Sequence, residues 1–169
     1  MEFRPYQVEA IESIYHFFEQ NKEGNPMIAM PTGTGKSIVI GGFVRSIFEH
    51  WPGQRVIKLT HVKELIEQNF DKLIRLWPTA PAGIYSASLN RRDIAPITYA
   101  GIASVWKKAE EFGHVDIALV DECHLVSEKD GTMYQTFFKG LRKINPALRV
   151  IGLSATCYRL GHGDRKSVV

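Results

Sequence analysis

The sequence predicts a doubly wound α/β fold, in which a mostly parallel sheet is flanked by helices. Stretches typical of strands alternate with stretches typical of helices along the chain. The run at residues 115–120 is almost entirely apolar, which is typical of a central parallel strand. The motifs that suggest chemistry each follow such a run. Since ligands of this fold class bind beyond the carboxyl ends of the strands, the position of the motifs supports the same fold.

Each expected element has a local signal. Arg4-Pro5 opens the first helix with proline in the first turn, and apolar residues at helical spacing continue to Phe18, before Gly24-Asn-Pro ends the helix. Later boundaries are indicated by the break at Trp51-Pro-Gly and by Pro78. Further helices are expected at residues 38–48, 62–76, 102–111 and 132–144. Strands are expected at residues 27–30, 56–60, 82–86, 97–99, 115–120 and 148–153.

Size and composition are those of a single soluble domain. The chain has 169 residues, enough for one sizeable core, and is 44% hydrophobic and 23% charged. The net charge of +3 permits a nucleic-acid partner without requiring one. No apolar run reaches the length of a membrane span and no signal peptide leads the chain, so we expect a cytoplasmic protein, associated with the nucleoid if it is bacterial, and no membrane partner.

The two cysteines do not form a disulfide framework. Cys123, His124 and Cys157 raise the possibility of a zinc site, but their spacing is wrong for a closed one and no fourth ligand is evident. A packed thiol and a hydrogen-bonded histidine are the preferred interpretation.

The last six residues, 164–169, resemble the translation of a common short-read sequencing adapter ahead of a stop codon. We therefore expect one native domain at residues 1–163, followed by a non-native tail. An ordinary basic tail is the alternative.

A phosphate-binding loop lies between the first expected strand and the second expected helix. Gly33 and Gly35 can take backbone conformations that point successive N–H groups at anionic oxygens, and the helix N-terminus adds its partial positive charge. Lys36 is expected to reach the β and γ phosphates, and the Ser37 hydroxyl to bind Mg²⁺. The residues expected to hold the nucleotide are Pro31, Thr32, Gly33, Thr34, Gly35, Lys36 and Ser37.

The loop departs from the strict pattern at one position. Met30 stands where the pattern has its first glycine, six residues before Lys36. The alternative is a glycine-rich turn that only starts a helix. The Gly-Lys-Ser sequence directly after a strand favours the phosphate loop.

A pair of acidic residues follows the apolar run at residues 115–120. Asp121 is expected to hold Mg²⁺ through water, and Glu122 to polarise the attacking water and accept its proton. Metal and base must flank the γ-phosphate together, which explains why the two carboxylates are adjacent. A solvated acidic turn is the alternative.

With these two motifs, the chain resembles the first RecA-like domain of superfamily 2 helicases of the DEAD/DEAH-box group, over nearly all of residues 1–163. Phe3-Arg-Pro-Tyr-Gln7 is similar to the adenine-reading segment of this family, which implies that Gln7 contacts adenine with Arg4 beside it. Residues 60–68 are similar to motif Ia and residues 98–104 to motif Ib, which implies that Lys63 and Ser104 contact a nucleic-acid backbone.

Ser154-Ala-Thr156 is similar to motif III, which couples hydrolysis to strand movement. If its strand lies beside the strand that bears Asp121, the hydroxyls of Ser154 and Thr156 can bond His124, which completes the catalytic set with Lys36, Asp121 and Glu122. Cys157 stands where the family usually has proline. Several segments, including Asp121-Glu-Cys-His124 and Arg159-Leu-Gly161, resemble RadD-type bacterial DNA-repair proteins most.

The resemblance implies an ATP- and Mg²⁺-dependent nucleic-acid motor, with DNA favoured over RNA as its track and DNA repair as its role. Such a motor closes two RecA-like domains on ATP, and the sequence shows only the first. We therefore expect slow hydrolysis by this chain alone. The alternatives are the motor subunit of a restriction enzyme, a nucleotide-binding module without turnover, and a small P-loop kinase, for which no arginine-rich lid is visible.

Overall fold

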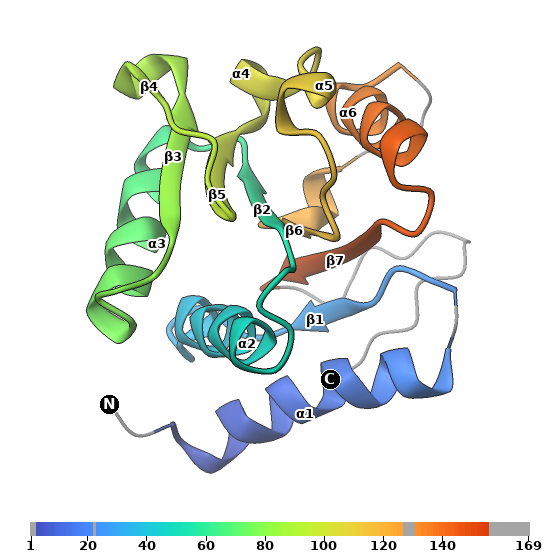
Figure 1. Ribbon diagram of the computed structural model, residues 1–169. Helices are drawn as coiled ribbons and strands as arrows, with labels where there is room; N and C mark the ends of the chain where they lie inside the picture. The colour runs from blue at the N-terminus through green and yellow to red at the C-terminus, as the bar shows by residue number, and fades with distance from the viewer. Residues whose placement is uncertain (1–2, 22, 127–130, 156–169) are drawn as a thin grey trace.

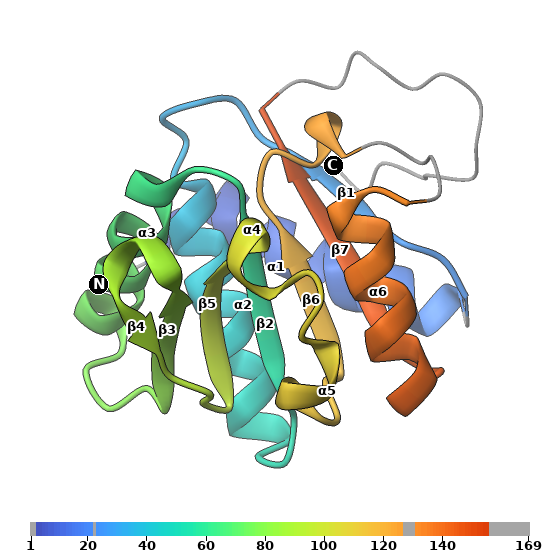
Figure 2. The same cartoon turned by 90° about the horizontal axis from the view of Figure 1, so that it is seen from above.

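The structure, a computed structural model, describes residues 3–21, 23–126 and 131–155. Seven strands form one sheet in the order β1-β7-β6-β2-β5-β3-β4, and Figure 2 shows this order from right to left, with β4 at the left. All neighbouring strands pair parallel except β3 and β4. The strands are β1 (Met27–Ala29), β2 (Val56–Thr60), β3 (Ala82–Ser86), β4 (Arg91–Arg92), β5 (Ile97–Gly101), β6 (Ile117–Val120) and β7 (Arg149–Ser154).

Helices cover both faces of the sheet (Figure 1). One hydrophobic cluster joins the sheet to the first three helices and a second joins it to the last three. The helices are α1 (Pro5–Gln20), α2 (Lys36–His50), α3 (Lys63–Leu76), α4 (Ile102–Val105), α5 (Ala109–Phe112) and α6 (Met133–Ile144), with two short 3₁₀ turns, η1 (Ala87–Leu89) and η2 (Cys123–Leu125). The doubly wound, mostly parallel α/β class predicted from the sequence is confirmed.

The prediction of a single helix at residues 102–111 is wrong. The structure has two short helices, α4 and α5, separated at residues 106–108. Ile102, Val105, Ala109 and Phe112 are all buried, so the apolar spacing is helical across the break. At the break the Lys108 backbone is not helical, and its ammonium donates to the Tyr85 hydroxyl at 3.2 Å.

The short antiparallel strand β4 was not expected. Its two arginines carry no apolar pattern, and it forms because Asn90 takes a left-handed conformation that turns the chain back onto β3. Within the described residues, no helix is both long and apolar enough to cross a membrane.

Sheet order places the important loops at one edge. The phosphate loop follows β1, Asp121 follows β6, and β7 runs between these two strands and ends at Ser154. Because all three strands are parallel, their carboxyl ends meet at this edge.

Candidate nucleotide-binding site

The loop at residues 31–35 has the backbone of a phosphate cradle. Gly33 has φ 82° and Gly35 has φ 86°, values that residues with a Cβ rarely adopt. A Cβ on Gly33 would meet nothing within 4 Å, whereas a Cβ on Gly35 would lie 2.6 Å from the Gln7 side-chain nitrogen. Gly35 precedes α2 directly, so the loop leads into the positive end of a 15-residue helix.

The α1 N-terminus packs against this loop. Gln7 is only 5% exposed, because its side chain bonds at both ends: its oxygen accepts from the Arg4 backbone N–H at 2.9 Å, and its nitrogen donates to the Thr34 carbonyl at 3.4 Å. The Tyr6 hydroxyl donates to the same carbonyl at 2.8 Å, and Thr34 in turn donates its hydroxyl to Pro31. Gln7 is therefore held beside the loop, and Arg4 is exposed at the start of the helix.

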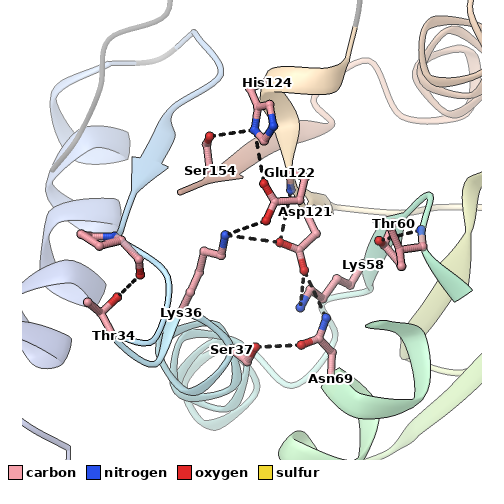
Figure 3. A network of polar contacts seen from close by, with 12 residues as sticks. Thr34, Lys36, Ser37, Lys58, Thr60, Asn69, Asp121, Glu122, His124 and Ser154 are labelled. Carbon is pink, nitrogen blue, oxygen red and sulfur yellow. Dashed lines mark hydrogen bonds and ion pairs between the residues drawn. The ribbon is translucent and has the colours of Figure 1, made fainter. Parts of the chain in front are cut away.

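Lys36 joins the loop to the acidic pair. Its ammonium lies 3.3 Å from Glu122 Oε1 and 3.8 Å from Asp121 Oδ1 (Figure 3). Glu122 has φ 50°, an uncommon conformation for a residue with a side chain. This left-handed turn carries the chain from β6 directly into η2, so that the two neighbouring carboxylates both face the loop.

His124 connects the acidic pair to the end of β7. Its Nδ1 lies 3.0 Å from Ser154 Oγ and 3.3 Å from Glu122 Oε2 (Figure 3). This contact exists because β6 and β7 are neighbours in the sheet, the condition on which the sequence argument depended. Thr156, the second expected coupling residue, lies outside the described residues, as does Cys157.

Two residues that the sequence argument missed complete the network. Asn69 of α3 accepts a hydrogen bond from Ser37 at 2.7 Å and donates one to Asp121 Oδ2 at 3.1 Å. Lys58 of β2 lies 3.4 Å from the same Asp121 oxygen and is 4% exposed. Burial lowers the pKa of Lys58, and the neighbouring Asp121 carboxylate opposes that shift.

A cleft of about 470 Å³, a size typical of ligand pockets, lies between the phosphate loop and the carboxylate pair. It is lined by Pro31, Thr32, Gly33, Gly35, Lys36, Ser37, Ile38, Leu65, Asn69, Lys72, Arg75, Asp121 and Glu122. The phosphate loop, both carboxylates and Ser37 thus share one cavity. Its basic residues favour an anionic ligand.

The donor set fits Mg²⁺. Ser37 Oγ and the Asp121 carboxylate are hard oxygen ligands, and the Asn69 side chain bonds to both of them. The described residues contain no group of three or more His, Cys, Asp or Glu side chains that could hold a metal by themselves. Such a site suits an ion that takes most of its remaining ligands from phosphate and water.

The expected nucleic-acid contacts do not line the cleft, although they lie at the same edge of the sheet. Lys63 is exposed in the first turn of α3, after β2, and Ser104 lies in α4, after the neighbouring β5. The Ser104 hydroxyl accepts a hydrogen bond from the Ala87 backbone at 2.9 Å, which ties α4 to the end of β3.

Comparison with known proteins gives a family. Residues 1–159 match the family described as "Type III restriction enzyme, res subunit". The activating signal cointegrator 1 complex subunit 3 of Rattus norvegicus is 22% identical over 171 residues, which cover 90% of this chain and 8% of that protein. This chain therefore spans only a small part of the curated relatives that it matches.

Solved structures share the fold. The UvsW helicase from bacteriophage T4 superposes with a TM-score of 0.69 at 24% identity, covering 92% of this chain and 53% of that chain. The Sulfolobus solfataricus SWI2/SNF2 ATPase core, solved in complex with dsDNA, gives 0.66 at 15% identity, covering 92% and 32%. Because the family match spans almost the whole chain, the protein belongs to the family of type III restriction enzyme res subunits and carries a superfamily 2 helicase RecA-like ATP-binding domain.

Proposed function

We propose that the chain binds ATP in the cleft between the phosphate loop and Asp121-Glu122, as the ATP-binding half of a DNA-dependent motor. The observation that carries the proposal is the position of Lys36, whose ammonium lies between the two carboxylates at 3.3 and 3.8 Å. Hydrolysis of a phosphoanhydride needs the lysine of the phosphate loop and a carboxylate pair on the same phosphate, and here they lie together.

The chain's own groups divide the work. Backbone N–H groups at Gly33 and Gly35 cradle the phosphates, and Lys36 exchanges its carboxylate partners for phosphate oxygens. Glu122, held on its other oxygen by His124, accepts a proton from the attacking water. Ser37 and Asp121 would hold Mg²⁺, which when bound neutralises charge on the transferring phosphoryl group.

The contact between His124 and Ser154 supports a role in coupling. Ser154 ends β7, and His124 touches both Ser154 and the proton-accepting Glu122. A change at the γ-phosphate that moves Glu122 therefore reaches the end of β7 through two contacts. We propose that this link passes the nucleotide state to a nucleic-acid-binding surface that includes Lys63 and Ser104, and that Thr156 also belongs to it.

Hydrolysis by this chain alone is proposed to be slow. Among the described residues lining the cleft, Arg75 is the one arginine, and it lies on α3 nearly two turns beyond Asn69. Arginine fingers on a second RecA-like domain would complete the site, and a missing finger costs on the order of 10³–10⁵ in rate.

DNA is the proposed track and DNA repair the proposed role, by resemblance to RadD-type proteins. The structural neighbour solved in complex with dsDNA supports a DNA track. A second candidate, the motor subunit of a restriction enzyme, is favoured by the description of the matched family and uses the same domain.

The test is ATP turnover by the purified 169-residue chain with no nucleic acid, with single- or double-stranded DNA, and with RNA. We expect slow turnover that DNA stimulates several-fold and that Glu122→Gln abolishes. Equal turnover under all four conditions would contradict a nucleic-acid-dependent motor, and stimulation by RNA alone would contradict the DNA track.

A further inference from the structure

A charged side chain lies where this fold normally has an apolar one. All five residues of β2 are buried, and the strand is hydrogen-bonded to β5 on one side and β6 on the other. Lys58 is the middle residue, paired with Tyr99 and Leu119, and its side chain is 4% exposed. Burying an ammonium group in a central strand is costly unless a counter-charge meets it.

The counter-charge is the carboxylate expected to serve the metal. Lys58 Nζ lies 3.4 Å from Asp121 Oδ2, which also accepts from Asn69 at 3.1 Å. The other oxygen, Oδ1, lies 3.8 Å from Lys36 and accepts from the Glu122 backbone N–H at 3.2 Å. Each Asp121 oxygen therefore has one ammonium group beside it, as Figure 3 shows.

The two lysines differ in what they can do next. Lys36 stands at the start of α2, with its side chain 16% exposed in the cleft, so it can turn to a phosphate. Lys58 is fixed beneath the site by its strand and by the Tyr99 ring, whose centroid is 5.5 Å from the ammonium. Of the two lysines, Lys58 is therefore the one that the fold itself holds on Asp121.

The charges around Asp121 balance without a ligand. Two ammonium groups, of Lys36 and Lys58, face two carboxylates, of Asp121 and Glu122. Lys72 and Arg75 add further positive charge to the cleft. A divalent cation approaching this group meets no net negative charge, and the nearby Lys58 repels it. A triphosphate brings the negative charge that the group lacks.

We propose that Lys58 is a permanent counter-charge of Asp121, which prevents this carboxylate from holding a divalent cation until a nucleotide brings one. Lys58 is thus a positioning residue that makes metal binding depend on the nucleotide. The inference rests on the proposed function, because it takes Asp121 to be the metal-side carboxylate.

The test measures Mn²⁺ binding to the full 169-residue chain without nucleotide, by electron paramagnetic resonance at neutral pH. We expect weak binding by the wild type and binding tighter by on the order of tenfold in Lys58→Met, because a repelling charge close to the metal is removed. Lys143→Met, which removes an exposed lysine of α6 by the same substitution, should bind like the wild type. A loosened fold could expose other carboxylates to Mn²⁺, so the tightening must also be shown to depend on Asp121.

A second background identifies the carboxylate involved. In Asp121→Asn, adding Lys58→Met should no longer tighten Mn²⁺ binding, because Lys58 acts through Asp121. If Lys58→Met does not purify as a folded protein, Lys58→Gln, which keeps a donor and removes the charge, replaces it. Unchanged or weaker Mn²⁺ binding in the charge-removing variant would overturn the proposal, as would equal tightening in both backgrounds.

Failure of this inference and failure of the proposed function are separable. Binding of Mg²⁺–ATP to the wild type is measured in the same preparation. If the wild type binds Mg²⁺–ATP and Lys58→Met does not tighten Mn²⁺ binding, the role of Lys58 alone is wrong. If the wild type binds no ATP, the nucleotide site itself is wrong.

Discussion

At the scale of single residues, the site is organised around the carboxylate of Asp121. This residue is 5% exposed, and its two oxygens contact side chains from three other elements, α2, β2 and α3. Its backbone N–H continues the sheet by donating to Leu59 at 2.9 Å. A carboxylate fixed at both its backbone and its side chain is pre-organised to receive a ligand.

Gln7 gives a testable prediction about the base. Replacing Gln7 by Ala removes the side chain that the family resemblance assigns to adenine, together with its bond to the Thr34 carbonyl. We expect the preference for ATP over GTP to fall several-fold while the protein stays folded. Competition binding with the two nucleotides measures it, and an unchanged base preference would count against the assignment.

What the sequence could reveal at this scale depended on motifs. Lys36, Asp121 and Glu122 were predicted because their spacing from strands is typical of phosphoryl transfer, and the structure brings them together. Lys58 and Asn69 were not predicted as site residues, because a lysine in a strand and an asparagine in a helix belong to no recognisable motif. Their importance arises only when the sheet places β2 beside β6 and α3 brings Asn69 to Asp121.

At the scale of elements, the local sequence pattern did not predict the break between α4 and α5 or the strand β4, where tertiary contacts occur. The apolar spacing of residues 102–112 is helical throughout, but the helix is interrupted before Lys108. Lys108 and Glu111 both bond to the Tyr85 hydroxyl, a tertiary contact that no local pattern shows. Strand β4 likewise forms on the edge of the sheet without an apolar pattern. Long, strongly patterned elements such as α1, α3 and β2 were predictable within one or two residues.

The close approach of α5 and α6 can be tested by a glycine substitution. A Cβ on Gly140 in α6 would lie 2.5 Å from the Ala109 Cβ, which cannot rotate away. The clash should outweigh the helix-propensity gain of about 1 kcal/mol, so Gly140→Ala should destabilise the fold by about 1–2 kcal/mol.

Urea unfolding measures this effect. Gly53→Ala is the matched control, because a Cβ there meets nothing within 4 Å, and it should change stability by less than about 0.5 kcal/mol. Equal stability of the two variants would contradict the packing of α5 on α6.

At the scale of the whole molecule, one edge of the sheet carries both parts of the proposed function. The nucleotide cleft lies where β1, β7 and β6 end, and Lys63 and Ser104 lie where β2 and β5 end. Neighbouring parallel strands therefore connect ATP to the proposed nucleic-acid contacts across this edge. The class of fold was predictable because alternation of strands and helices is a property of the whole sequence, whereas the strand order had to be seen.

The proposed need for a second domain predicts that this chain alone does not unwind DNA. We expect no strand separation of a fluorescently labelled forked duplex by the 169-residue chain with ATP and Mg²⁺, even where slow ATP turnover is detected. Robust unwinding under these conditions would show that one RecA-like domain suffices and would refute the proposal.

The central claim is that Lys36 and the carboxylate pair form an ATP site. Its most direct test is equilibrium binding of a fluorescent ATP analogue with Mg²⁺ to the wild type and to Lys36→Ala, with circular dichroism to check folding. Loss of the ammonium should weaken binding by on the order of 10–100-fold, because a charge-assisted contact contributes about 1.5–3 kcal/mol. Equal affinity of the two folded proteins would contradict the account.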